Sequence, residues 1–202
     1  MEGAHSILSG RGEVKASLKG LVEAIGNCSR CPFIDKPFLL YGVYENWLPR
    51  KVKVLLVAES PPPGPKADFF YNLALPDRLR RNIRTILGLP IGEKEVPAWL
   101  KNAGAFLTCA VKCRPYQGRA TYRDEKAIRL MAIRCAPILA LEVKALRPGK
   151  VILLGRIAEA AASVIGLEPY ARLPHPNFMV RFRRDLMPEA RATILSALSD
   201  PG

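Results

Sequence analysis

Short runs of apolar residues, each followed by a loop rich in proline, glycine or charge, predict the strands of a central sheet. The run at Val52–Ala58 reads VKVLLVA and is almost continuously apolar, which is typical of a strand covered on both faces. Comparable runs lie at Ala105–Val111 and Val151–Leu154, and a shorter one at Tyr170–Leu173 predicts a further strand. We therefore expect a sheet of about four strands.

Segments with helical periodicity lie between and around these strands. The expected helices cover Val14–Ile25, Pro76–Leu87, Asp124–Leu146, Ile157–Ile165 and roughly Pro188–Leu198. The stretch Lys36–Pro49 contains prolines and aromatic residues and is expected to form a loop with a short strand. Strands that alternate with helices favour parallel pairing. The predicted fold class is therefore α/β, a three-layer sandwich with a mostly parallel central sheet and helices on both faces.

The chain has 202 residues and no internal repeat or linker, so we expect one domain over residues 1–202, with about 12 disordered residues at its N-terminus. No apolar run is long enough to span a membrane. The start lacks the apolar core of a secretory signal, and five cysteines do not suit a secreted disulfide scaffold. These features predict a monomer in the cytoplasm, near the nucleoid, with no membrane partner.

The charge balance is strongly basic. Lys and Arg number 31 and Asp and Glu number 18, which gives a net charge of +13. Such a charge favours an anionic partner, most commonly nucleic acid, although a basic surface also suits a heat-stable protein. The arginines gather in two places, at Arg78, Arg80 and Arg81 and at Arg181, Arg183 and Arg184.

Four cysteines form the clearest chemical pattern. Cys28 and Cys31 are separated by two residues in CSRCPF, a spacing that lets two sulfurs reach one metal centre. Cys113 and Cys135 lie far along the chain and would tie the N-terminal segment to the middle of the domain. Four thiolates suit a 4Fe–4S cluster or a structural zinc ion, and four unrelated thiols are the third alternative.

Candidate chemistry lies in the loops that follow the expected strands, because parallel sheets bind ligands at the carboxyl ends of their strands. Glu59 begins the proline-braced loop ESPPPGP, where a carboxylate could activate water or stabilise positive charge. His175 lies between two prolines and could donate to a developing oxyanion. Phe69 and Phe70 could stack on a base. The alternatives are a capping glutamate, a surface histidine and ordinary core rings.

A series of segments, in order and over roughly Leu18–Leu186, resembles the iron–sulfur uracil-DNA glycosylases called family 4, within the uracil-DNA glycosylase superfamily. The segments are CSRCPF, VKVLLVAESPPPG, LTCAVKCRPYQGR, the helix that holds Glu125, Cys135 and Pro137, VILLG, and LPHPNF. The resemblance implies that the four cysteines described above bind a 4Fe–4S cluster. It implies an enzyme of base excision repair that flips a damaged base, uracil or another deaminated base, and hydrolyses its N-glycosidic bond.

The resemblance also implies roles for single residues. Glu59 would assist the water or the oxocarbenium ion, His175 would stabilise charge that leaves onto the base, and Phe70, in preference to Phe69, would stack on the flipped base. The stretch from Asn177 onward would follow the histidine into DNA. There Phe178 or Met179 would fill the gap left by the flipped nucleotide, and the arginines would hold phosphates; these are Arg181, Arg183 and Arg184.

The chain departs from the family pattern in three places. The first motif reads AESPPPG instead of GEAPG, and FFY replaces a PFVG-like stretch. Cys109 stands where the family has the asparagine that reads the base edge, and a thiol is a poor donor and a poor acceptor. Which base is removed is therefore open. The alternative function is a non-catalytic nucleic-acid-binding iron–sulfur protein on the same fold; a third reading, a zinc-stabilised nucleotide-binding protein, lacks any GxGxxG or GxxxxGK string.

Overall fold

A sheet of four parallel strands forms the centre of the described part of the chain. The computed structural model describes residues 16–65, 67–116 and 124–199. The strands are β1 (Val54–Ala58), β2 (Ala105–Cys109), β3 (Lys150–Leu154) and β4 (Ala171–Leu173), in the order β2-β1-β3-β4. Leu56 of β1 is paired with Leu107 on one side and Ile152 on the other. The parallel sheet predicted from the apolar runs is confirmed.

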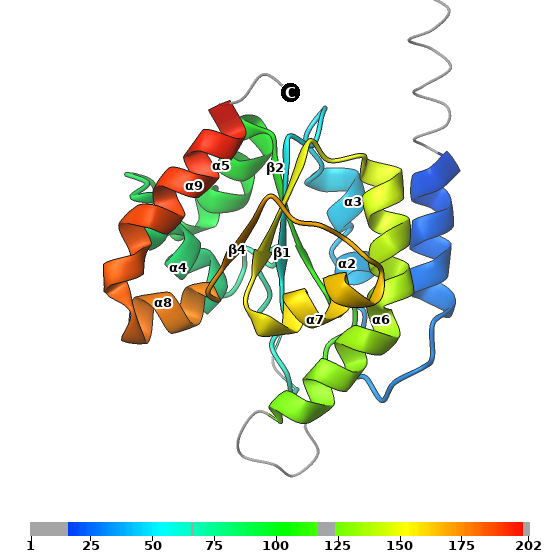
Figure 1. The fold of residues 1–202 in the computed structure, drawn as a ribbon. Helices are drawn as coiled ribbons and strands as arrows, with labels where there is room; N and C mark the ends of the chain where they lie inside the picture. Colours follow the sequence, from blue (N-terminus) through cyan, green and yellow to red (C-terminus); the bar gives the residue numbers. More distant parts are fainter. Residues whose placement is uncertain (1–15, 66, 117–123, 200–202) are drawn as a thin grey trace, which may run out of the picture.

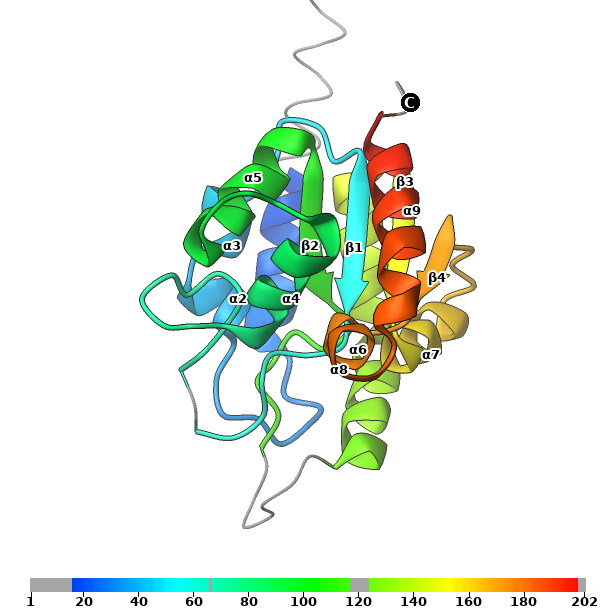
Figure 2. The ribbon, with the colours of Figure 1, turned by 90° about the vertical axis from the view of Figure 1, so that its left-hand side faces the viewer.

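Helices cover both faces of this sheet and so complete the three layers (Figure 1). They are a helix over residues 16–27, then α2 (Pro37–Leu40), α3 (Val43–Asn46), α4 (Arg78–Leu87), α5 (Val96–Ala103), α6 (Glu125–Leu146), α7 (Arg156–Val164), α8 (Pro176–Phe182) and α9 (Met187–Ser199), with 3-10 turns at Glu93–Glu95 and Arg184–Leu186. Figure 2 shows α4, α5 and α9 in front of the sheet and α6 behind it. β1 and β2 are buried along their whole length, as the apolar runs predicted.

The ends of the longer helices follow from local chemistry. α4 begins at Asp77, whose carboxylate accepts a hydrogen bond from the Arg80 amide, and it ends at Gly88, whose φ of 63° suits glycine. α6 begins at Asp124, whose carboxylate accepts from the Ala127 amide, and its C-cap is Arg147 at a φ of 45°. The sequence predicted Gly88 as the stop of α4 and the end of α6 before Pro148, and both are confirmed.

Four short helices differ from the prediction, and a proline in the first turn accounts for three of them, α2, α5 and α8. The stretch Lys36–Pro49 contains two short helices, α2 and α3, and the expected short strand is absent from it. α5 and α8, which were not predicted, carry Pro97 and Pro176 in their first turns. Proline fits the first turn of a helix because that turn leaves its amides unpaired. Pro176 therefore lies in a helix in the segment that was interpreted as a loop, and Pro97 lies in one in a stretch for which no element was predicted.

The N-terminal predictions fall partly on residues that the structure does not describe. Val14, where the first helix was expected to begin, and the N-terminal stretch expected to be disordered lie outside the described residues. Among the described residues, no helix combines the length and the apolar character that a membrane crossing requires.

Candidate active site

A pocket of about 1450 Å³ lies at the carboxyl ends of the strands. Its walls come from the loops after β1 and β4, the end of β2 and parts of α4, α7 and α8. The pocket collects the residues that the sequence singled out for chemistry and base recognition; they are Glu59, Phe69, Phe70, Cys109 and His175. Residues from distant parts of the chain thus meet where a parallel sheet places its ligands.

Glu59 enters the pocket directly from β1. It is buried, and its backbone carbonyl accepts a hydrogen bond from the Val111 amide at 3.0 Å. The loop that follows is held by Arg114, which is almost fully buried and donates to the carbonyls of Pro62 (3.1 Å) and Asp68 (3.0 Å). The Arg114 Nε also pairs with Asp35 at 3.0 Å. This guanidinium fixes the far side of the proline loop and so limits the positions that Glu59 can take.

His175 is the N-cap of α8. Its Nδ1 accepts a hydrogen bond from the Asn177 amide at 3.2 Å. In a neutral imidazole whose Nδ1 accepts, the hydrogen is on Nε2, so that nitrogen is a donor. Gly155, which follows β3, has a φ of 96°, and a Cβ at this position would lie 2.9 Å from the Cβ of His175. A glycine is needed there because the backbone comes so close to the histidine.

The two phenylalanines occupy different surroundings. The Phe69 ring packs against Phe38, Tyr41 and Tyr71, with centroids 5.3, 5.7 and 5.8 Å away. Among the described residues, Phe70 makes one ring contact of this kind, with Tyr71 at 5.0 Å, and its carbonyl accepts from Arg80 at 3.0 Å. Phe69 is therefore tied into the aromatic core, and Phe70 is the better placed of the two to offer a face to the pocket.

Arg80 does not belong to a basic surface, in contrast to the expectation from its neighbours in sequence. It is fully buried, donates to the carbonyls of Phe70, Asn72 and Leu75, and pairs with Glu93 at 3.2 Å. Arg81 pairs with the same Glu93 at 3.3 Å. Buried carbonyls of an irregular loop need donors, and a guanidinium offers five. Of the predicted cluster at residues 78–81, only Arg78 lines the pocket.

Cys109 ends β2 inside the pocket and is almost fully buried. Burial raises the pKa of its thiol well above the ordinary value, an effect that the nearby Lys112 ammonium offsets in part. Burial therefore favours the neutral thiol over the thiolate. The neutral thiol can contribute one weak donor and one weak acceptor, which fits its predicted weakness as a base reader.

A buried ion pair that the sequence did not reveal contacts the backbone of Cys109. Lys112 and Glu142 are both fully buried and form a salt bridge of 2.5 Å. The Lys112 Nζ also donates to the Cys109 carbonyl at 2.7 Å, and Glu142 accepts from Tyr44 (2.7 Å) and Thr108 (2.8 Å). The pair is well satisfied by hydrogen bonds and joins the end of β2 to α3 and α6, so losing one partner would leave a buried charge.

The four candidate metal-ligating cysteines line a second, smaller pocket, and all of them are free thiols; they are Cys28, Cys31, Cys113 and Cys135. Cys109 does not line it, which separates the fifth cysteine from the set. Among the described residues, no group of three or more His, Cys, Asp or Glu side chains is placed to hold a metal ion.

The chemistry of this pocket fits a metal centre with thiolate ligands. Burial, and then the neighbouring thiols, raise the pKa of Cys113 to about 12, and burial also raises the pKa of Cys135. Thiolates would therefore need a cationic group among them. Four cysteine thiolates are the ligand set of a 4Fe–4S cluster and also of a structural zinc ion, so the lining of this pocket fits either group.

The segment expected to enter DNA forms α8 and the turn after it. Met179 is buried, so of the two candidates for filling the gap in the duplex it is Phe178 that faces outward. Asn177 accepts a hydrogen bond from Asn82 of α4 at 2.8 Å. Arg181 and Arg184 line the pocket; Arg183 does not, and it pairs with Asp185 at 2.8 Å.

Comparison with known proteins gives matches over most of the chain. Residues 45–199 match the sequence model of the uracil DNA glycosylase superfamily. Over 148 residues the chain is 28% identical to a protein of Pyrobaculum aerophilum named type-4 uracil-DNA glycosylase. The aligned part is 71% of this chain and 63% of that protein, so the chain spans less than two thirds of the length of this relative.

Proposed function

The chain belongs to the uracil-DNA glycosylase superfamily, and from that premise we propose that it is a DNA glycosylase of base excision repair, which flips a damaged base out of DNA and hydrolyses its N-glycosidic bond. One observation carries this proposal: a carboxylate, an imidazole and an aromatic ring, those of Glu59, His175 and Phe70, line the same pocket at the carboxyl ends of the strands. The name of the Pyrobaculum aerophilum relative supports the same activity.

The two polar groups suit the two charges that the reaction develops. As the bond from C1′ to the base nitrogen breaks, its electron pair leaves with the base and the sugar becomes positive. The Glu59 carboxylate stabilises that positive charge and accepts a proton from the water that attacks C1′. The His175 Nε2–H donates to the oxygen of the leaving base, on which negative charge collects. The Phe70 ring stacks on the flipped base and holds it in place.

The proposal also includes a 4Fe–4S cluster, which the thiolates of the four cysteines in the smaller pocket would hold, with a structural zinc ion as the alternative. The cluster would supply cross-linking, because its ligands come from the segment after the first helix, the loop after β2 and the middle of α6. The roles given to Glu59 and His175 need no electron transfer. The cluster therefore belongs to the stability of the fold in this proposal.

The substrate is proposed as uracil or another deaminated base in DNA. Cys109 leaves the finer choice open, because its neutral thiol cannot read a base edge as an amide does. The same residue favours the second candidate function, a nucleic-acid-binding protein that does not cut the bond. The two candidates share the fold and the pocket but differ in whether any base is released.

Base release from a panel of DNAs decides between them. Each duplex or single strand holds one uracil, hypoxanthine or xanthine, and single-turnover rates are measured with wild type, Glu59→Gln and His175→Ala. Both variants should cut about 100-fold more slowly, because each loses one group that stabilises charge in the transition state, while DNA affinity stays close to that of wild type. Glu189→Gln, an exposed carboxylate on α9, is the matched control.

Wild-type protein that binds these DNAs and releases no base would reject the enzyme and leave the binding protein. Equal rates for wild type and both variants would reject the assigned roles.

A further inference from the structure

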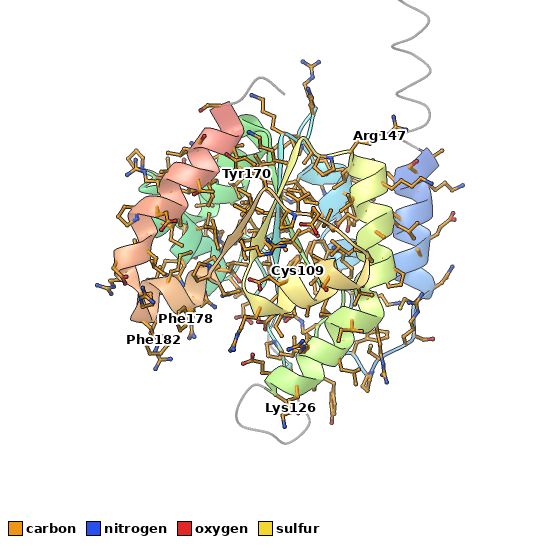
Figure 3. The ribbon with its side chains drawn as sticks, in the orientation of Figure 1. Cys109, Lys126, Arg147, Tyr170, Phe178 and Phe182 are labelled. Carbon is orange, nitrogen blue, oxygen red and sulfur yellow. The ribbon has the colours of Figure 1, made fainter. Side chains whose placement is uncertain are left out.

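We propose that Phe178 and Phe182 form a stacking surface for the bases of an unpaired DNA strand beside the pocket. This inference rests on the proposed function and names the form of DNA that the site prefers. The two rings are 48% and 62% exposed, and both line the pocket. Figure 3 shows their side chains together at one edge of the molecule, at the end of α8.

The spacing of the rings decides how they can bind a base. They lie four residues apart on α8, which places them on one face of the helix, and their centroids are 5.7 Å apart at an angle of 46°. A base held between two rings needs them about 7 Å apart, twice a normal contact of ~3.5 Å. The rings are too close for a slot, so they act as one extended surface on which bases stack from outside.

The residues around the rings point to a nucleic acid as the occupant. The Arg181 guanidinium lies 4.9 Å from the centre of the Phe182 ring, and Arg78 and Arg184 line the same pocket. In the described part of the chain, none of these three arginines takes part in a salt bridge. The Arg184 Nε donates to the Val180 carbonyl at 2.9 Å, and the rest of its charge is not neutralised by a carboxylate of the described residues. An exposed aromatic surface flanked by cations that lie outside these salt bridges matches bases joined by phosphates, since each base has a face and each phosphate has a charge.

An unpaired strand fits this surface better than a duplex. In a duplex both faces of each base are covered by its neighbours, so a protein ring reaches a base face only where it opens a step. Phe178, the ring nearer to His175 in sequence, can fill the single gap that a flipped nucleotide leaves. Phe182, one helical turn further on, meets a free base face only if the next nucleotide is unpaired. On contact that base displaces the Arg181 guanidinium from the ring, and the guanidinium can then pair with the phosphate of the same nucleotide.

Binding of DNA without any lesion tests this surface. Fluorescence anisotropy is measured with a labelled single strand and with the duplex of the same sequence, over a range of salt concentrations. Phe182→Ala should weaken single-strand binding about 10-fold and duplex binding less than about 3-fold. The lines of log affinity against log salt should stay parallel to those of wild type, because stacking releases no counterions.

Two further variants make the result specific. Phe182→Trp keeps a large aromatic face and should retain single-strand binding. Tyr170→Ala removes a ring of similar exposure that does not line the pocket, and should change nothing. Equal weakening on both DNAs, or unchanged single-strand binding by Phe182→Ala, would overturn the inference. Because the DNA carries no lesion, this outcome is independent of base release: excision with unchanged single-strand binding removes the stacking surface and leaves the proposed function standing.

Discussion

Cys109 is the pocket residue at which the chain departs most clearly from the family pattern described above. It ends β2, its carbonyl accepts a hydrogen bond from Lys112, and burial raises the pKa of its thiol, which favours the neutral form. The position of the residue is therefore fixed, while its side chain offers little to the edge of a base. An asparagine there could donate and accept at the same time, which is what the pattern of a lactam base such as uracil requires.

Cys109→Asn should raise uracil excision by about 10-fold or more if the edge contact is the missing part, because sites that hydrogen-bond a substrate discriminate far more strongly than apolar ones. The rate is measured on DNA with one uracil, beside the other deaminated bases. Cys109→Ala is the control, since it removes the thiol without adding an amide. An amide variant that gains nothing over the alanine variant would place the cause of base preference elsewhere, for example in the proline loop.

Single residues show what sequence can and cannot reveal about this site. Glu59 and His175 could be placed at one pocket from the sequence because Glu59 directly follows β1 and His175 lies two residues after β4, and a parallel sheet brings the carboxyl ends of its strands together. Arg80, Arg114 and Lys112 were not, because a charged residue in an irregular stretch reads as a surface residue. Their burial depends on carbonyls and carboxylates that only the folded chain brings within reach.

At the scale of elements, α4 is anchored where it meets the pocket. Its N-cap, Asp77, is buried and accepts from the Arg80 amide. Burial raises the pKa of the Asp77 carboxyl, with Asp68 and Glu93 adding to the effect, while the hydrogen bond and charge of Arg80 oppose it. A carboxyl whose pKa is higher in the folded than in the unfolded chain binds more protons when folded. The folded state therefore loses stability as pH rises from the unfolded value of about 3.9 through the raised folded value.

Asp77→Asn should remove this pH-dependent cost and keep the cap, because asparagine caps helices as well as aspartate does. The free energy of unfolding is measured by denaturant titration at a series of pH values from about 3.5 to 7. Relative to wild type, the variant should gain stability as pH rises through that window and then hold a constant advantage. Asp77→Ala, which loses the cap, should be about 1 kcal/mol less stable than Asp77→Asn. A difference between Asp77→Asn and wild type that does not vary with pH would contradict the raised pKa.

Elements with a clear apolar run or cap were predictable and most of the short helices were not, for a physical reason. β1 and β2 lie in almost continuous apolar runs, and α4 and α6 have clear N-caps, so in these four elements local chemistry and tertiary packing favour the same structure. α2, α3 and α8 are each seven residues or fewer, too short to be stable without the rest of the fold. α8 matters most, because it turns a segment interpreted as a loop into a rigid carrier of His175 and Phe178.

At the scale of the whole molecule, the cysteine pocket joins segments that the sheet alone does not hold together. Protein purified without oxygen should be brown, with broad absorbance near roughly 400 nm, and chelation or oxidation of the cluster should lower its thermal stability. Cys28→Ala and Cys135→Ala should lose the colour and much of the solubility. Cys109→Ala should keep the colour, because Cys109 lies outside this pocket. Colourless protein with one zinc per chain would replace the cluster by the zinc alternative.

The effect of the net charge of +13 on DNA binding depends on where the basic residues lie, and not only on their number. Arg80, Arg114 and Lys112 are buried and committed to the fold, so they add no phosphate contacts. Arg181 and Arg184, like Arg78, line the pocket, and their loss should change DNA binding.

Replacing both Arg181 and Arg184 with alanine should lower the slope of log affinity against log salt for duplex DNA by about 1.8, since each phosphate contact contributes about 0.9. Arg183→Ala is the matched control, because this guanidinium already pairs with Asp185 and does not line the pocket. Its removal should change the slope by less than half of the amount that one phosphate contact contributes. Affinity is measured by anisotropy at several salt concentrations. Arg183→Ala could instead lower the slope as much as the loss of one pocket arginine. The DNA backbone would then run along the outer side of the turn after α8, and the assignment of the phosphate contacts to the pocket arginines would be wrong.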